Sequence, residues 1–171
     1  MSAFSESQKF RQWWLWAIIA GTLLVPLGIV LYEIYAGHKS YTAAEILSGA
    51  AVPASIILLF LSFRLDSRID ETGVYYRFFP LQIKMNEIKW EEITKIYTGQ
   101  YRPLADYGGW GIRYGLKGLG TAYSISGDMG LQVEVKKGRK ILIGTLQAPT
   151  INKALKQLAA EKKISRNILI A

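Results

Sequence analysis

The residue types that most often carry enzyme chemistry are scarce in this sequence of 171 residues. It contains no cysteine, which excludes thiolate catalysis, disulfide bonds and metal sites of the cysteine type. The single histidine, His38, has no second histidine with which to form a paired metal motif. We therefore expect no metal, no cofactor and no catalytic residue.

Two other patterns that resemble catalytic or nucleotide-binding motifs also have simpler explanations. Glu91 and Glu92 are adjacent, so in an extended strand they point to opposite faces and cannot act as an acid/base pair on one substrate. The glycines between residues 108 and 120 form neither G-x-G-x-x-G nor G-x-x-x-x-G-K-[ST]. Turns and close backbone approaches explain these glycines, and the sequence favours a protein that is not an enzyme.

Four basic residues bracket an expected hairpin turn and form the densest cationic cluster of the chain: Lys136, Lys137, Arg139 and Lys140. Such a cluster attracts anionic headgroups by about 1 kcal/mol per residue when it reaches a membrane surface. A hydrated hairpin tip is the alternative. Phosphate backbones of nucleic acids also bind basic surfaces; however, a position beside an anionic leaflet already explains the charge, so we expect no nucleic-acid partner.

Trp110 and Arg113 are the candidate contacts for a partner or ligand. A tryptophan among glycines at the end of a strand can be exposed for binding, although a core tryptophan flanked by glycines has the same pattern.

Two long apolar segments precede the part of the chain that carries these residues. Residues 13–35 have no charge before Glu33 and, as a helix, span roughly 33 Å, enough to cross a bilayer. Residues 46–63 provide about 18 further uncharged positions. We expect an N-terminal segment over 1–12, transmembrane helices over 13–35 and 46–63, a short external loop over 36–45 and a separate domain over 64–171.

The short loop predicts that the two helices are antiparallel neighbours. Small residues that allow close backbone approach are candidates for packing within this hairpin: Ala17, Gly21, Gly28, Ala50, Ala54 and Ser55. Pro26 and Pro53 lie near the middle of each helix and predict kinks.

The orientation in the membrane follows from local positive charge. Lys9 and Arg11 precede the first segment and Arg64 and Arg68 follow the second, whereas only Lys39 lies between them. Both termini and the domain over 64–171 are therefore expected in the cytoplasm. That domain carries 18 of the 21 Lys and Arg residues of the chain.

Beyond the apolar segments the periodicity becomes that of short strands. Alternating residues predict strands around 74–79, 83–90, 95–101, 110–114 and 121–126, and a hairpin with strands over 131–135 and 141–143. Residues 90–93 predict one helical turn. From Pro149 the spacing of Ile151, Ala154, Leu155 and Leu158 predicts an amphipathic helix. The apolar residues Ile168 to Ile170 are expected as an edge strand or a packed tail.

About seven strands followed by one C-terminal helix resemble a pleckstrin-homology (PH) domain. The stretch 108–145 adds Gly109 to Arg113, Ala122-Tyr123, Ser126-Gly127 and Ile143 to Thr145, which are similar to a bacterial PH-like membrane protein family with two N-terminal transmembrane helices. The resemblance implies a bent, antiparallel, barrel-like β domain closed by a helix, at the bacterial inner membrane, without enzymatic activity. The loop 79–82 lacks the basic cluster by which phosphoinositide-binding PH domains recognise their lipid.

These observations favour a membrane-tethered PH-like binding or scaffolding module whose partner is a protein, including copies of itself. The alternatives are an accessory or regulatory subunit of a transporter or membrane enzyme, and a module that binds anionic lipids.

Overall fold

The computed structural model describes residues 2–115, 118–136 and 138–169. The described chain divides into two compact units. Residues up to Lys9 and from Arg64 onward form one, which we call the β unit, and Phe10–Phe63 form the other, which we call the hairpin.

The hairpin consists of two helices, α1 (Trp13–Tyr35) and α2 (Ala43–Ser62), both long and apolar enough to cross a membrane. The bounds of α1 confirm the helix expected over 13–35. The second helix begins three residues before the expected position because Thr42 caps it. The Thr42 side chain accepts a hydrogen bond from the Glu45 backbone N–H, and the Glu45 side chain accepts one from the Thr42 backbone N–H.

Aromatic rings gather at the end of the hairpin where the chain enters and leaves it. The Phe10 ring lies 5.8 Å from that of Phe60 and 6.1 Å from that of Phe63, measured between centroids. Trp16 donates its indole N–H to the Phe10 carbonyl oxygen. These contacts join the segment before α1 to the last turn of α2.

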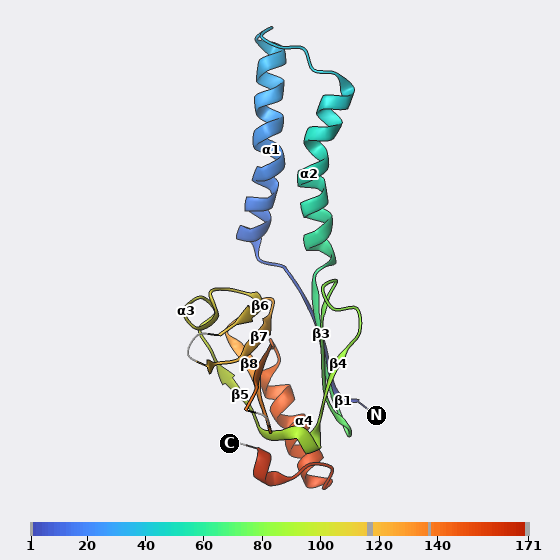
Figure 1. The fold of residues 1–171 in the computed structure, drawn as a ribbon, viewed down its shortest axis with the longest axis vertical. Coiled ribbons are helices and arrows are strands. Elements are labelled where there is room, and N and C mark those ends of the chain that lie inside the picture. Colours follow the sequence, from blue (N-terminus) through green and yellow to red (C-terminus); the bar gives the residue numbers. More distant parts are fainter. Residues whose placement is uncertain (1, 116–117, 137, 170–171) are drawn as a thin grey trace. The chain divides into compact units, whose positions relative to one another are not determined.

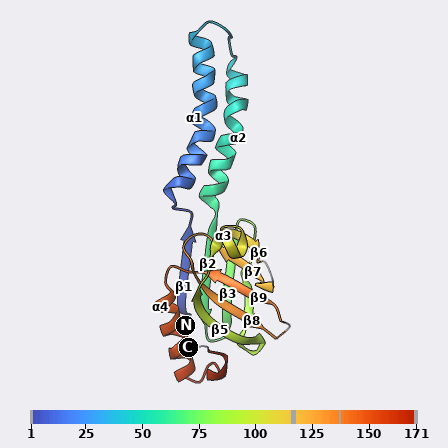
Figure 2. The same ribbon diagram turned by 90° about the vertical axis from the view of Figure 1, so that its left-hand side faces the viewer.

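The β unit contains two sheets. The first is antiparallel, with the order β1 (Ser2–Lys9), β2 (Arg64–Asp70), β3 (Gly73–Phe79) and β4 (Asn86–Lys89). The second has the order β5 (Ile93–Gln100), β8 (Met129–Val135), β9 (Lys140–Gly144), β7 (Thr121–Ser124) and β6 (Gly111–Tyr114). Figure 2 shows the second sheet in front of the first.

Short helical segments connect and follow the strands. The 3₁₀ turn η1 (Trp90–Glu92) separates β4 from β5, and α3 (Pro103–Tyr107) separates β5 from β6. The helix α4 (Ala148–Ala160) lies against β1, β5 and β8, and the 3₁₀ turn η3 (Arg166–Ile168) follows it. The helical turn near residue 90 and the amphipathic C-terminal helix are thus confirmed.

The core lies between the two sheets and α4. Its fully buried side chains come from both sheets and from the helix: Leu65, Ile69, Val74, Ile88, Ile96, Leu131, Leu142, Ile143 and Ile151. Tyr76 of the first sheet packs against Tyr123 of the second, with the ring centroids 4.7 Å apart and the ring planes tilted by 52°. Burial raises the pKa of the Tyr76 phenol further above its ordinary value.

The structure differs from the fold expected from sequence in several details. The described residues form nine strands instead of about seven; β7 and β9 are parallel rather than antiparallel; and the strands form two sheets instead of a closed barrel. The pairing of β4 with β3 ends at Lys89, where η1 begins. After this turn the chain continues as β5 in the second sheet. The expected strand from residue 83 begins only at Asn86, because the last pair with β3 is Tyr76 with Asn86.

The strand β1 was not expected from sequence. It pairs along its length with β2, from Ser2 opposite Asp70 to Lys9 opposite Arg64, although the whole hairpin separates the two strands in the chain. Its inward residues are Phe4, Glu6 and Gln8, all buried, while Ser5 and Ser7 face outward and are exposed. The hairpin is therefore an insertion between two neighbouring strands of one sheet.

Because Lys9 and Arg64 are cross-strand partners, a short turn can replace the hairpin. We predict that a chain in which residues 10–63 are replaced by Asn-Gly folds as a soluble β unit with a cooperative urea transition. The fragment 64–171 lacks β1 and exposes the edge of β2, so we expect it to aggregate or to lose cooperativity. Equal stability of the two proteins in circular dichroism would contradict the role assigned to β1.

Candidate functional site

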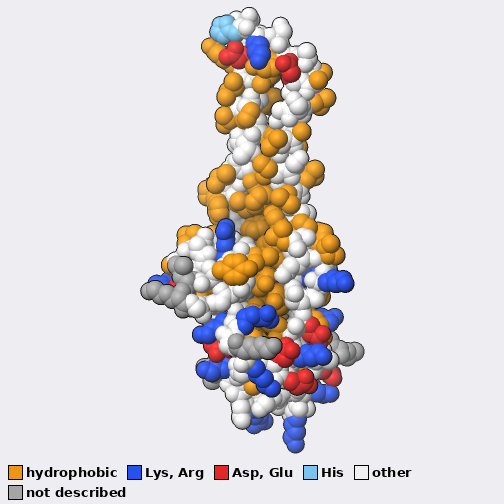
Figure 3. Space-filling model, viewed as in Figure 1, with side chains coloured by type: hydrophobic (Ala, Val, Ile, Leu, Met, Phe, Trp, Pro, Cys, Tyr) orange, Lys and Arg blue, Asp and Glu red, His pale blue; other side chains and the backbone are white. Residues whose placement is uncertain are grey.

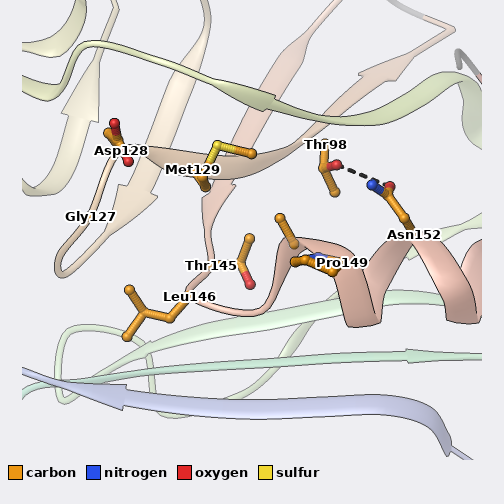
Figure 4. Close-up of a pocket in the computed structure, with 9 residues that line it drawn as sticks. Thr98, Gly127, Asp128, Met129, Thr145, Leu146, Pro149 and Asn152 are labelled. Atoms are coloured by element: carbon orange, nitrogen blue, oxygen red, sulfur yellow. Dashed lines mark hydrogen bonds between the residues drawn. The ribbon is translucent and has the colours of Figure 1, made fainter.

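A candidate for a binding site in the β unit is a cavity of about 380 Å³ where α4 begins (Figure 4). It is formed by the edge of β5, the turn before β8, and the segment that joins β9 to α4. Its lining residues are Thr98, Gly127, Asp128, Met129, Thr145, Leu146, Ala148, Pro149 and Asn152.

The cavity combines apolar walls with hydrogen-bonding groups at its rim. Met129, Leu146 and Pro149 supply apolar surface. Thr98 donates its hydroxyl to the Asn152 side-chain oxygen at 3.0 Å, and the Asp128 carboxylate accepts a hydrogen bond from Gln100 at 2.6 Å. This arrangement can hold an apolar group and orient a polar one beside it.

The segment that forms one wall of the cavity is held by a buried carboxylate from β1. Glu6, only 7% exposed, accepts hydrogen bonds from the Thr145 hydroxyl at 2.6 Å and from the Leu146 backbone N–H at 3.0 Å. The same hydroxyl accepts a hydrogen bond from the Gln147 backbone N–H at the start of α4. We call Glu6 and Thr145 the β1 clamp.

A second side chain of β1 reaches the same region. Gln8 is buried and donates its side-chain N–H to the Gly144 carbonyl oxygen at 2.8 Å, where β9 ends. The inward polar residues of β1 thus connect the first sheet to the second. No sequence pattern pointed to Glu6 or Gln8, because polar side chains at alternate positions look like the solvated face of a strand.

On the outer face of the first sheet, Asp66 of β2 joins three strands. Its carboxylate accepts hydrogen bonds from the Ser7 hydroxyl of β1 at 2.7 Å and from the Arg77 guanidinium of β3 at 2.6 Å. Partial burial alone would raise the pKa of Asp66, but these bonds and the charge of Arg64 outweigh burial and lower it below its ordinary value.

The basic cluster predicted from sequence lies at the β8–β9 hairpin. Lys136, Arg139 and Lys140 are exposed, and Lys137 lies outside the described residues. The Lys140 ammonium lies 3.8 Å from the Glu134 carboxylate, and the Lys136 backbone N–H bonds to the Glu92 carbonyl oxygen. The cluster lies apart from the cavity, and its contact with lipid stays a prediction.

Trp110 and Arg113 lie together at the start of β6. The half-buried Trp110 donates its indole N–H to the Gly127 carbonyl oxygen at 2.9 Å, and the exposed Arg113 donates to the Trp110 carbonyl oxygen at 3.2 Å. Gly127 also lines the cavity, so Trp110 supports its rim through the backbone. Their contact with a partner stays a prediction.

The small residues of the hairpin lie on different faces of its helices. Ala50 lines a gap of about 490 Å³ between α1 and α2, beside Pro26 and Pro53. A methyl group added at Gly21 or Gly28 would meet no atom within 4 Å. Three further residues of this set are exposed: Ala17, Ala54 and Ser55. The role of the set in packing between α1 and α2 stays a prediction.

Comparison of the chain with models of protein families, with curated proteins and with solved structures found no match. Within the described ranges, no group of three or more His, Asp or Glu residues is placed to hold a metal ion.

The β1 clamp generates a prediction about stability. Glu6→Ala leaves the Thr145 hydroxyl and the Leu146 N–H without their acceptor, which we expect to lower the free energy of unfolding by about 2 kcal/mol. Glu6→Gln keeps an acceptor oxygen and should cost less. Urea unfolding of the chain with the hairpin replaced measures both, with Glu91→Ala in the exposed turn η1 as control. A loss no larger than that of the control would refute the clamp.

Proposed function

We propose that this chain is a multi-pass membrane protein whose β unit is a PH-like, non-enzymatic binding module. It mediates association with a protein partner, in the first place another copy of itself, at the cytoplasmic surface of the bacterial inner membrane.

The observation that carries the proposal is the insertion of the hairpin between β1 and β2. Two crossings return the chain to the side from which it started, and only then can the two strands meet in one sheet. Two connections at neighbouring strands also restrict the β unit more than a single tether does. Such a restricted module is suited to presenting a binding surface at a fixed level near the bilayer, where the local concentration of membrane-bound partners is high.

The cavity at the start of α4 supports a binding role. Its volume of about 380 Å³ is within the range of sites for small ligands and is large enough for one or two apolar side chains. Its walls are mostly apolar, and the hydroxyl and amide groups of Thr98 and Asn152 mark one side. A partner segment with a large apolar residue next to a backbone amide fits these features.

The positive charges on either side of the hairpin in the sequence support the cytoplasmic orientation. Lys9 and Arg11 lie just before α1, and Arg64 and Arg68 lie just after α2. Bacterial origin and the PH-like class rest on the sequence resemblance alone.

A second candidate function is that of an accessory subunit of a transporter or membrane enzyme. It is favoured by the exposed small residues on the helices, among them Ala17, Gly28 and Ala54, where a helix of a larger protein can approach closely.

The orientation generates a prediction for intact cells. Because the natural chain has no cysteine, single cysteines can be placed at Ser5, Ser126 and Lys39. We expect an impermeant thiol reagent to label Lys39→Cys in intact cells and to label the other two only after permeabilisation. Labelling of Ser5→Cys or Ser126→Cys in intact cells would overturn the topology.

Self-association generates a second prediction, tested by native mass spectrometry of the full chain extracted into lipid nanodiscs from its own membranes. We expect homo-oligomers, and we expect Asn152→Trp, which covers the cavity, to shift them towards monomer at least tenfold. Lys153→Trp, at the next position of α4 and outside the cavity, is the matched control. A stoichiometric foreign subunit would favour the second candidate, and a monomer under all conditions would contradict self-association.

A further inference from the structure

One end of the β unit is defined by the residues at which the chain passes to the hairpin. Lys9 ends β1, Arg64 begins β2, and the two are cross-strand partners. Arg64 in turn pairs with Phe79, the last residue of β3. These three residues therefore lie side by side at one end of the strands of the first sheet, which we call the connection end.

The loop that leaves the connection end, residues 80–85, exposes large apolar side chains. Leu81 is 65% exposed and Ile83 is 77% exposed, and Met85 is exposed beside them. The loop backbone is held in place: Gln82 exchanges hydrogen bonds with the Phe78 backbone, and Arg77 donates to the Ile83 carbonyl oxygen at 3.2 Å. Exposure of these side chains is thus a feature of an ordered loop.

The second sheet adds two more exposed leucines near the same end. Gln8, next to Lys9, bonds to Gly144 at the end of β9, and Leu146 follows two residues later at 63% exposure. Thr145, which precedes Leu146, donates its backbone N–H to the Met129 carbonyl oxygen. Met129 pairs with Gln100, so the end of β5 lies near Leu146 as well. The chain then enters α3, where Leu104 is 71% exposed. Leu81, Ile83, Leu104 and Leu146 form what we call the apolar rim.

The opposite end of the β unit is charged. The turn between β2 and β3 lies there, roughly 20 Å from Arg64 along a strand of seven residues. The Trp90 backbone N–H donates to the Thr72 carbonyl oxygen of this turn. From Trp90, η1 leads to Ile93, which pairs with Val135 beside the basic hairpin, so the basic hairpin lies near the same end. Glu71 and Lys163 form an ion pair at 3.0 Å beside it. Figure 3 shows Lys, Arg, Asp and Glu side chains gathered around the lower part of the β unit.

We infer that the apolar rim is a membrane-docking surface that enters the interface of the phospholipid bilayer. The inference rests on the proposed insertion of the hairpin. Only Phe63 separates α2 from β2, and only Phe10 to Gln12 separate β1 from α1. At about 3.5 Å per residue, these links hold the connection end within roughly 15 Å of the ends of the helices.

The side chains of the rim are better suited to the membrane interface than to exposure in water or to binding of a strongly anionic ligand. Leucine and isoleucine side chains gain free energy when they leave water for the boundary between headgroups and acyl chains. Lys84 lies within the loop, and Lys9 and Arg64 lie at the connection end from which the loop starts. When the rim enters the interface, these cations are placed at the depth of the lipid phosphates. On this inference the apolar rim faces the bilayer.

The test uses the full chain in nanodiscs of phosphatidylcholine with phosphatidylglycerol. A bimane fluorophore is attached to a single cysteine at Ile83, at Glu91 in the charged end as matched control, or at Ile29 in the middle of α1. We expect lipids brominated along their acyl chains to quench the label at Ile83 at least twofold and the label at Glu91 by less than a tenth. The label at Ile29 reports insertion of the hairpin itself.

The outcomes separate the two proposals. Quenching at Ile29 without quenching at Ile83 would overturn docking and leave the membrane insertion intact, whereas no quenching at either position would overturn both. Quenching at Ile83 should persist in nanodiscs of phosphatidylcholine alone; its loss there would show attraction by charge instead of apolar insertion and would contradict the inference. A second experiment places the label at Leu104 and replaces Leu81 and Ile83 by Asp. Because these replacements should withdraw the rim from the bilayer, we expect aqueous iodide to quench the label's fluorescence at least twofold more strongly.

Discussion

The ladder between β1 and β2 joins residues that the chain separates by two long helices. Seven backbone positions of β1 find their partners in β2, and the pair Lys9 and Arg64 closes the ladder beside the hairpin. Bringing such distant segments together costs loop-closure entropy, which the ordered helical hairpin reduces because its two helices return the chain towards its starting point. The inward side chains of β1 then complete the unit: Phe4 enters the core, and Glu6 and Gln8 hold the end of β9 and the start of α4.

This constraint links the proposed membrane anchor to the proposed binding site. The wall of the cavity at Thr145 and Leu146 depends on Glu6, which precedes the hairpin, whereas the rest of the cavity is built by residues that follow it. The β unit consequently cannot be completed until both helices have been made. We expect membrane insertion to precede the final folding of the cavity, so that a binding-competent module forms only on a chain that is already anchored.

The strongest signals in the sequence were long and periodic. Both apolar helices, the hairpin of β8 and β9 and the amphipathic α4 follow patterns that side-chain burial imposes directly. The strand β1 was missed because two of its three inward side chains are polar and form hydrogen bonds to distant parts of the β unit, which no local pattern reveals. Ile83 and Met85 were assigned to a strand because they alternate, yet pairing with β3 extends only to Asn86, and the residues before it form a loop held by Gln82 and Arg77. The cavity joins β5, β8 and α4 and could not be found by spacing at all.

The central claim, that β1 pairs with β2 across the hairpin, is tested most directly by disulfide formation in native membranes. Cross-strand partners have Cα atoms about 5 Å apart, within the range of a disulfide. The account predicts that mild oxidation joins Ser5→Cys to Arg68→Cys, which are partners, and leaves Ser5→Cys with Arg64→Cys, four positions along the strand, unjoined. Equal joining of the two pairs, or none in either, would contradict the pairing and with it the placement of the hairpin inside the sheet.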